Sequence, residues 1–450
     1  MSGYSFPSVV ALCYWLLVGL YGAKVFAVIS PISAVGSKFF HDNGQQYYVK
    51  GIAYQLTAND PLVDTEQCKL DAALMEELGA NAIRVYHVDP NSDHDGCMEA
   101  FADAGVYVFV DLDTFTTEIS EDNPHWNVTQ FNGYKKVLDV FQGYENTAGV
   151  FVGNEVLTTS KGFGAAPYIK AAARDIKAYR ESKGYRKIPV GYSAADIASL
   201  RPMLQNYMAC SKNSSENLDF FSLNAYEWCG RSSFTLSGYS MLAVNATGYT
   251  IPIFFSETGC NTNPPRDFMD QTAILGPSME DTWSGAVIYE WIQETNDYGL
   301  VSYGPYDPEA SPTIAFVEDG YTRRGTPTPV YPDFDNLKSR WATLKPSGVA
   351  LADYSAFATE LTPPPCPAPT SDGWDLDAES PLPSLGQSLT MESTTTASSA
   401  TETGTEPTER AGPVTGGASR ISIMGPANVD GVSTLMMLLA GTVGVLCWWL

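Results

Sequence analysis

The sequence predicts an α/β protein whose main domain is a (β/α)8 TIM barrel, followed by a disordered stalk rich in Ser, Thr and Pro. Short apolar runs recur along the chain and alternate with amphipathic stretches of helical length, which is the pattern of a parallel barrel. The folded domain is expected to span residues 30–366, a length that suits one barrel.

Eight apolar runs are expected to form the barrel strands, because a strand buried on both faces reads as a continuous apolar stretch. They cover residues 47–54, 81–86, 106–112, 148–153, 188–192, 220–224, 252–256 and 285–289. Amphipathic stretches predict helices over 66–78, 99–104, 134–144 and 169–183. A doubly wound open sheet is the alternative, but it favours a glycine-rich phosphate loop after the first strand, where Gly51 stands alone.

The first 27 residues have the pattern of a secretory signal peptide. An apolar stretch over 9–23 precedes Lys24 and the small-residue pattern 25–27, where cleavage is expected. Ala34 offers a second cleavage position. An N-terminal membrane anchor is the alternative, although the apolar stretch is shorter than the roughly 20 residues that span a bilayer.

The C-terminal end predicts attachment to a GPI lipid. Residues 431–450 form an apolar tail without a charged residue, and they follow small residues and a polar spacer. Residues 367–430 are rich in Ser, Thr, Pro and Gly, so we expect a linker that does not fold and that contains the attachment site. A tail-anchored helix is the alternative. With a GPI anchor, the protein would lie on the extracellular face of the plasma membrane or move into the cell wall.

The cysteines and sequons also point to a secreted protein. Cys13 and Cys447 lie in the predicted signal and tail, and the six others are even in number, so disulfides are expected although spacing alone leaves their pairing open. No metal site is expected, because the chain has no CxxC motif and only four histidines. The six cysteines are Cys68, Cys97, Cys210, Cys229, Cys260 and Cys366, and the N-glycosylation sequons begin at Asn127, Asn213 and Asn245.

The charge balance limits the choice of partner. The formal net charge is −25, from 51 acidic and 26 basic residues. Such a chain is not expected to bind nucleic acid or an anionic membrane surface. A neutral polymer is a more suitable substrate.

Two segments end abruptly in a glutamate after a run of apolar and small residues. Residues 149–156 contain Glu155, and residues 251–260 contain Glu257. These segments fall on the fourth and seventh predicted strands, which lie nearly opposite each other, and the C-terminal ends of barrel strands form the catalytic face. Two carboxylates, one a proton donor and the other an ionised nucleophile, are the minimum equipment for cleaving a glycosidic bond.

Polar and aromatic residues follow all eight predicted strands and would surround this pair. Aromatic faces stack on sugar rings, while carboxylates and amides bind hydroxyls. Asn154 is expected to bind the sugar 2-hydroxyl, and Tyr226 and Tyr289 to donate to the nucleophile. Tyr298, Tyr303 and Tyr306, just after the last strand, are candidates for a platform that holds an acceptor sugar. The other residues at strand ends are Tyr54, Gln55, Arg84, Tyr86, Asp111, Asp113, Tyr192, Asp196, Asn224, Glu227, Glu290 and Trp291.

Several motifs occur in an order that resembles one known family. They are KGIAYQ (50–55), NAIRVY (81–86), HDGCM (94–98), GNEV (153–156), PVGYSAAD (189–196), NAYEWCG (224–230), SETGCN (256–261) and NDYGLV (296–301). Together they resemble the β-1,3-glucanosyltransferases of glycoside hydrolase family 72, which are GPI-anchored enzymes of fungal cell walls. The resemblance covers the whole expected barrel.

The resemblance implies roles for individual residues. Glu155 resembles the acid/base and Glu257 the nucleophile of retaining transglycosylation between β-1,3-glucan chains, with no cofactor. The family's disulfides imply the pairs Cys68–Cys97, Cys210–Cys366 and Cys229–Cys260, and this chain resembles the subgroup without a Cys-rich module. The residues expected to bind substrate are Tyr54, Gln55, Tyr86, Asp111, Asn154, Asp196, Arg201, Tyr226 and Tyr289.

The chain also departs from the family pattern. In the loop after the third strand an Asn-Arg pair is usual, whereas residues 119–124 read ISEDNP. This difference leaves the sugar contacts of that loop open, as well as the balance between transfer and hydrolysis. A retaining endo-β-1,3-glucanase, an inactive glucan-binding wall protein and a GPI-anchored structural protein are the alternative functions.

Overall fold

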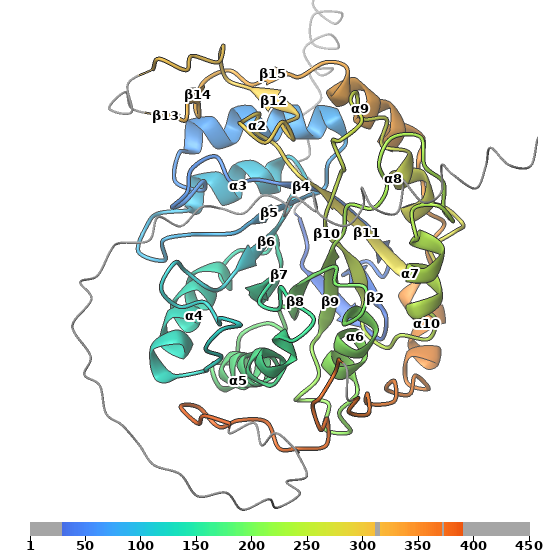
Figure 1. Ribbon diagram of the computed structural model, residues 1–450. Coiled ribbons are helices and arrows are strands. Elements are labelled where there is room, and N and C mark those ends of the chain that lie inside the picture. Colours follow the sequence, from blue (N-terminus) through green and yellow to red (C-terminus); the bar gives the residue numbers. More distant parts are fainter. Residues whose placement is uncertain (1–28, 311–315, 371–372, 390–450) are drawn as a thin grey trace, which may run out of the picture. The chain divides into compact units, whose positions relative to one another are not determined.

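The computed structural model describes residues 29–310, 316–370 and 373–389 (Figure 1). The predicted signal peptide, the predicted apolar tail and residues 390–430 of the predicted linker lie outside these ranges.

The domain is a closed barrel of eight parallel strands, and all eight predicted strands are present. Their order around the barrel is β10-β11-β4-β5-β6-β7-β8-β9, and Figure 1 shows them at the centre with helices around them. The first predicted strand was too long, because Gln46–Tyr47 forms β3 of a separate sheet. The barrel strands are β4 (Val49–Ala53), β5 (Ala82–Val85), β6 (Tyr107–Asp111), β7 (Thr147–Asn154), β8 (Val190–Ala195), β9 (Phe220–Asn224), β10 (Ile253–Thr258) and β11 (Trp283–Ile288).

Closure of the barrel between its last and first strands requires a glycine. Gly285 of β11 lies opposite Val49 of β4 and has a φ of 107°, a value that side chains rarely tolerate. A Cβ atom at this position would lie 2.1 Å from the carbonyl oxygen of Val49. The strands can therefore approach closely only where this side chain is absent.

A small antiparallel sheet closes the end of the barrel opposite the mouth. It consists of β1 (Ile32–Val35), β2 (Lys38–His41) and β3. The Phe39 ring packs against Phe109, Phe220 and Phe254, with centroids 6.0–6.4 Å apart. Phenylalanine therefore fills this half of the barrel interior, and the polar residues are confined to the other half.

Helices cover the outside of the barrel, and α4 shows how their ends are fixed. Asn127 accepts hydrogen bonds from the backbone of Thr129 and Gln130, while the Gln130 side chain accepts one from the backbone of Asn127, a complete capping box. The helices after strands are α2 (Thr65–Leu78), α3 (Asp95–Asp103), α4 (Val128–Phe141), η1 (Gly162–Ala165), α5 (Ala166–Ser182), α6 (Arg201–Ala209), α7 (Tyr239–Asn245) and α8 (Met269–Ile274).

The chain beyond the barrel folds back over it. Two short antiparallel pairs join β12 (Val301–Ser302) to β15 (Thr328–Pro329) and β13 (Val317–Glu318) to β14 (Tyr321–Thr322). Helices α9 (Asp333–Thr343) and α10 (Leu351–Ala358) follow. The three disulfides are Cys68–Cys97, Cys210–Cys366 and Cys229–Cys260, which confirms the pairing implied by the family resemblance.

The folded domain continues past the predicted boundary at residue 366. Trp374 is fully buried and packs against Tyr207 and Phe163. The backbone of Gly386 and Leu389 is also tied to the helical layer, through hydrogen bonds to the Trp126 carbonyl and the Tyr168 hydroxyl. Residues 373–389, which lie beside α5 in Figure 1, were therefore wrongly predicted to belong to the unfolded linker.

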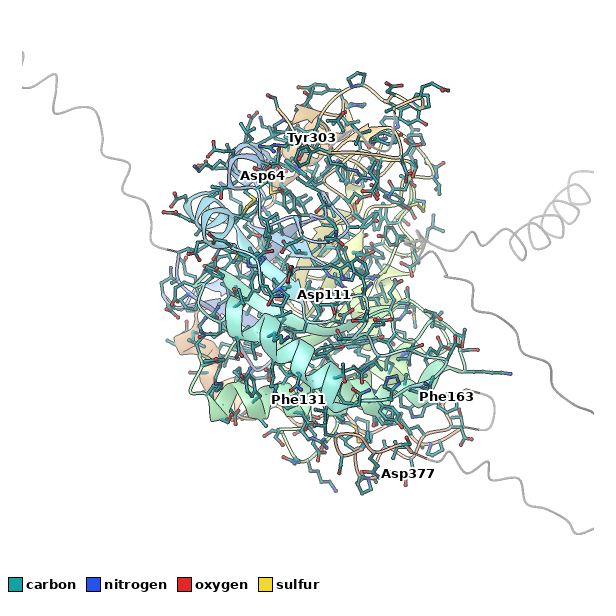
Figure 2. All side chains as sticks on the ribbon, turned by 90° about the vertical axis from the view of Figure 1, so that its left-hand side faces the viewer. Asp64, Asp111, Phe131, Phe163, Tyr303 and Asp377 are labelled. Atoms are coloured by element: carbon teal, nitrogen blue, oxygen red, sulfur yellow. A yellow bond between two sulfur atoms is a disulfide. The ribbon has the colours of Figure 1, made fainter. Side chains whose placement is uncertain are left out.

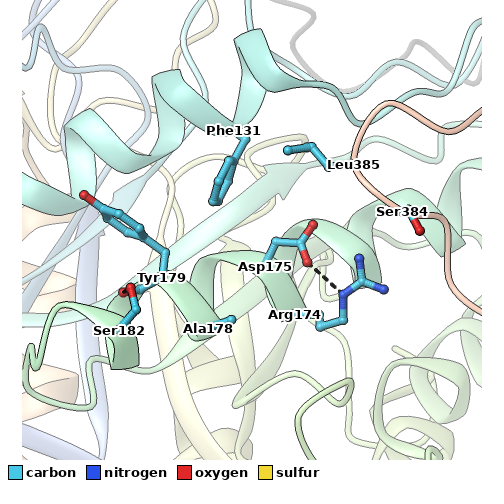
Figure 3. Close-up of a pocket in the computed structure, with 8 residues that line it drawn as sticks. All are labelled: Phe131, Arg174, Asp175, Ala178, Tyr179, Ser182, Ser384 and Leu385. Carbon is cyan, nitrogen blue, oxygen red and sulfur yellow. Dashed lines mark hydrogen bonds and ion pairs between the residues drawn. The ribbon is translucent and has the colours of Figure 1, made fainter.

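This segment also borders a groove on the outside of the domain. The groove has a volume of about 490 Å³ and lies between α4, α5 and residues 384–385 (Figure 3). Phe131, Tyr179 and Leu385 form its apolar lining, and Arg174 pairs with Asp175 beside them. Neither of the two predicted catalytic glutamates lines it.

None of the helices in the described ranges is both long enough and apolar enough to cross a membrane.

We expect Trp374→Ala to destabilise the domain by about 3–5 kcal/mol, as for other large buried aromatic residues. The free energy of unfolding in denaturant, measured with the disulfides intact, tests this. Ser388→Ala, at an exposed position of the same segment, is the control. A loss below about 0.5 kcal/mol for Trp374→Ala would mean that the segment does not belong to the folded domain.

Candidate active site

Glu257 is surrounded by hydrogen-bond donors. It lies on β10 and is 8% exposed. The Tyr86 hydroxyl donates to Oε1 at 2.9 Å, and the Tyr226 hydroxyl donates to Oε2 at 2.8 Å. The Arg84 guanidinium lies 3.5 Å from Oε1. All three contacts favour the ionised carboxylate, as expected for a nucleophile.

Burial acts on Glu257 in the opposite direction. Loss of water raises its pKa, and the nearby Glu155 raises it further, while Arg84 and the two tyrosine hydroxyls lower it, so that the pKa is about 7. Burial by itself would favour the neutral acid, so the negative charge of Glu257 depends on Arg84 and the two tyrosine hydroxyls.

Glu155 has a different environment from Glu257. It follows β7 with a φ of 47°, a left-handed conformation that is uncommon for a residue with a side chain. Its backbone amide donates to the Ser193 carbonyl at 2.8 Å, and its Oε1 accepts from the Asn224 amide at 3.0 Å. Within the described ranges Oε2 accepts no hydrogen bond, so this oxygen can present a proton to a substrate.

Arg84 is the centre of the polar layer below the two glutamates. It is fully buried on β5, and its Nη2 donates at 2.9 Å to both Asp111 and Asn154. Its guanidinium packs on the rings of Tyr86 and Phe151, with centroid distances of 4.4 and 4.5 Å. Removing one partner of such a buried pair typically costs about 3–5 kcal/mol, because the other charge is left unpaired. The hydrogen bonds to Asp111 and Asn154 and the two aromatic rings together hold the Arg84 guanidinium in one orientation.

Asn224 connects the two glutamates through this layer. Its amide nitrogen donates to Glu155 and, at 3.0 Å, to Asn154. Its amide oxygen accepts from Arg84 Nη1 at 3.4 Å, and the same Nη1 lies 3.5 Å from Glu257. Both carboxylates are thus in one hydrogen-bonded network at the C-terminal ends of the strands.

Four of the predicted substrate residues belong to this network, and one supports it from outside. Tyr86 and Tyr226 contact Glu257, while Asn154 and Asp111 contact Arg84. Asp111 is buried beneath Arg84, at the position labelled in Figure 2, so it orients this side chain and does not reach the mouth. Gln55 accepts hydrogen bonds from the backbone of Tyr86 and His87 and so fixes that loop.

Two tyrosines predicted at the mouth lie elsewhere. Tyr54 is buried, and its hydroxyl donates to Asp71 of α2 at 2.8 Å. Tyr303 is buried too, donates to the same carboxylate at 2.8 Å and accepts from the Trp291 indole. They link the barrel to α2 and to the chain after β11, and Figure 2 shows Tyr303 at the upper edge of the domain. The predictions that they contact sugar were wrong, because both hydroxyls point into the protein.

Several other residues that were predicted to bind substrate or Glu257 have different contacts in the structure. Tyr289 makes no hydrogen bond to either glutamate in the described structure. Its ring instead lies edge-on to Tyr226, with centroids 6.4 Å apart, and Tyr86 takes the expected place as second donor to Glu257. Asp196 and Arg201 form an ion pair with each other. Of the tyrosines expected to hold an acceptor sugar, Tyr298 is buried, whereas Tyr306 is 54% exposed.

The three sequons lie on the surface of the domain. Asn127 caps α4, Asn213 is in an exposed loop and Asn245 ends α7. Asn127 caps the helix through its side-chain oxygen Oδ1, so its amide nitrogen, the atom that would carry a glycan, takes no part in the cap.

A third carboxyl group near the mouth was not assigned a role from the sequence. Glu290 is buried, and its Oε1 accepts from Asn296 at 2.6 Å. Burial and the neighbouring charge of Glu294 raise the pKa of Glu290 to about 8. Arg84 and Asn224 were noted at strand ends but were also not assigned to the site, since spacing does not show which side chains meet.

Two carboxylates at the C-terminal mouth of a parallel barrel, one held by donors and the other with a free oxygen, form the arrangement of retaining glycosidases and related enzymes. The profile of glycoside hydrolase family 72, described as glucanosyltransferase, matches residues 22–317. The chain belongs to this family.

Relatives and solved structures agree with the family. Protein EPD1 of Candida maltosa is 41% identical over 78% of this chain and 61% of its own length. The 1,3-beta-glucanosyltransferase gas2 of Schizosaccharomyces pombe is 40% identical over 80% of this chain and 76% of its own. A mutant of Saccharomyces cerevisiae Gas2p in complex with laminaritetraose and laminaripentaose is 37% identical, with a TM-score of 0.69, over 79% of this chain and 75% of that structure.

The chain spans less than two thirds of the first curated relatives that it matches. It covers 61% of Protein EPD1 and 53% of the 1,3-beta-glucanosyltransferase PGA5 of Candida albicans.

We expect Tyr86→Phe and Tyr226→Phe each to shift the acid limb of the pH profile of kcat/KM upward. Each loses a donor to ionised Glu257, so the pKa of this carboxyl rises and the nucleophile forms only at higher pH. A shift of about one to two units is expected, because a hydrogen bond to a charged group is worth about 1.5–3 kcal/mol and one pKa unit corresponds to about 1.4 kcal/mol.

Cleavage of a laminari-oligosaccharide over a range of pH provides the measurement. Tyr289→Phe is the control, because this hydroxyl does not bond to Glu257, and its acid limb should stay at the wild-type pH. Equal shifts in all three variants, or none, would contradict the account of Glu257.

Proposed function

We propose that the protein elongates β-1,3-glucan by retaining transglycosylation. It cleaves an internal β-1,3-glucosidic bond and transfers the new reducing end to the non-reducing end of another chain. One observation carries the proposal: Glu257 is held by Tyr86, Tyr226 and Arg84, while Glu155 keeps an oxygen free to donate a proton. The family, and relatives named as 1,3-beta-glucanosyltransferases, support the same reaction.

In the first step Glu257 attacks the anomeric carbon of an internal glucose. An oxygen lone pair of Glu257 forms the new C–O bond while the glycosidic C–O bond breaks, and Glu155 gives its proton to the leaving oxygen. The reducing-end fragment departs, and the rest of the donor stays attached to Glu257 as an ester. Asn154, oriented by Arg84 and Asn224, binds the 2-hydroxyl of the reacting sugar.

In the second step an acceptor glucan displaces Glu257. Glu155, now ionised, takes the proton of the 3-hydroxyl at the acceptor's non-reducing end, and this oxygen attacks the anomeric carbon. Two inversions at one carbon give net retention. Tyr306 is an exposed aromatic residue beyond the last strand that suits an acceptor sugar, which must compete with water for the ester.

The expected location of the protein follows from the segments that flank the barrel. A signal peptide over residues 1–27 and a GPI signal over 431–450 would place the enzyme on the outer face of the plasma membrane, where it meets wall glucan. No cofactor takes part in the proposed reaction.

Incubation with a reduced laminari-oligosaccharide tests the proposed function. Transfer gives products longer than the donor, whereas a β-1,3-glucanase gives only shorter products. Glu155→Gln and Glu257→Gln are the control variants, and each should lower turnover about 100-fold or more while keeping the wild-type circular dichroism spectrum. Shorter products alone would show hydrolysis, and no product with the wild-type protein would favour a glucan-binding wall protein.

A further inference from the structure

The loop between β6 and α4 is tied to the loop that follows Glu155. The carboxylate of Glu121 accepts from the backbone amides of Thr158 and Thr159 at 2.6 and 3.2 Å. It also accepts from both threonine hydroxyls, at 2.5 Å from Thr158 and at short range from Thr159. Four donors from two adjacent residues therefore converge on one carboxylate.

The position of this contact matters because Glu155 adopts an unfavourable backbone conformation. A left-handed φ at a residue with a side chain costs free energy and persists only where the surrounding structure holds it. On the N-terminal side, the strand pairing of β7 with β8 holds Glu155. On the C-terminal side, Leu157 is buried and its amide donates to the Tyr192 hydroxyl at 3.4 Å, a long hydrogen bond. The bonds to Glu121 come next along the chain and are shorter.

The Glu121 carboxylate fits beside η1 only because residue 162 is a glycine. Gly162 begins η1, and a Cβ atom there would lie 2.4 Å from Oε1 of Glu121. The carboxylate is thus enclosed between Gly162 and the two threonines. Its hydrogen bonds lower the pKa of Glu121 below the ordinary value although partial burial opposes them, so the acceptor is charged in neutral and mildly acidic media.

We propose that Glu121 is a positioning residue for the proton donor: by fixing Thr158 and Thr159 it keeps Glu155 in the left-handed turn that aims its free oxygen at the leaving group. This inference rests on the proposed function and assigns a role to a loop whose sugar contacts the sequence left open. Glu121 does not touch the substrate. It acts through Glu155 alone, so its loss slows the proton transfers of both steps, to the leaving oxygen and from the acceptor hydroxyl, and leaves the attack by Glu257 intact.

Comparing two donors of different leaving-group quality tests the proposal. A laminari-oligosaccharide needs protonation of its leaving oxygen, whereas the corresponding laminari-oligosaccharyl fluoride releases fluoride without such help. Glu121→Ala should lower kcat on the oligosaccharide by about 10- to 100-fold, the range expected for a displacement of roughly 1 Å, with little change in KM. The burst of fluoride released in the first turnover, before the ester is broken down, should keep a rate within about twofold of the wild-type rate.

Asp122→Ala is the matched control, because this neighbouring carboxylate is exposed and makes no hydrogen bond in the described structure. It should behave like wild type on both donors. Gly162→Ala places a methyl group against the Glu121 carboxylate, displaces it, and should reproduce the loss on the oligosaccharide. With this second variant the proposal does not depend on Glu121→Ala alone, which could fold poorly.

The outcomes are distinct. The proposal would be overturned by wild-type rates for Glu121→Ala on the oligosaccharide, or by an equal loss in the first-turnover release of fluoride, and either result would leave the proposed function in place. If the wild-type protein itself acted on neither donor, the proposed function would fail, and this inference with it.

Discussion

The site depends on one buried cation, the guanidinium of Arg84. The polar layer of an otherwise phenylalanine-filled barrel is arranged around it, since a buried charge needs partners on every side. One edge of its planar group binds Asp111 and Asn154, and the other reaches Ser193, Asn224 and Glu257. Arginine suits this role better than lysine, because its fixed fork of donors orients several acceptors at once. The orientation of the Glu257 carboxylate and of the Asn154 amide is therefore set by the same residue.

The two glutamates differ in what surrounds them. Glu257 is buried among donors, so that burial raises its pKa while Arg84, Tyr86 and Tyr226 oppose the rise. Glu155 accepts one hydrogen bond from Asn224 and keeps its other oxygen free at the end of a strained turn. Different environments give two identical side chains different tasks, which is how one barrel can supply both an acid and a nucleophile. A rigid base of packed aromatic rings below the polar layer helps to hold both in place.

Much of this fold could be predicted, because eight continuous apolar runs mark strands buried on both faces. The positions of Glu155 and Glu257 at the mouth followed from the strand ends. The roles of Tyr54 and Tyr303 did not, since a place near a strand end does not show whether a side chain turns toward the mouth or toward a helix such as α2. Composition also misjudged residues 373–389, where Trp374 and a few leucines anchor a chain that is otherwise rich in Pro and Ser. The contacts of Arg84 and Glu121 join distant loops, which no local pattern reveals.

The most direct test of the account is to trap the covalent intermediate. A 2-deoxy-2-fluoro laminari-oligosaccharyl fluoride slows both steps, the second more than the first, so a glycosyl-enzyme should accumulate and survive proteolysis. Mass spectrometry of the peptides should place the added sugar on Glu257. A label on Glu155 or Glu290, or none at all despite release of fluoride, would contradict the assignment of the nucleophile.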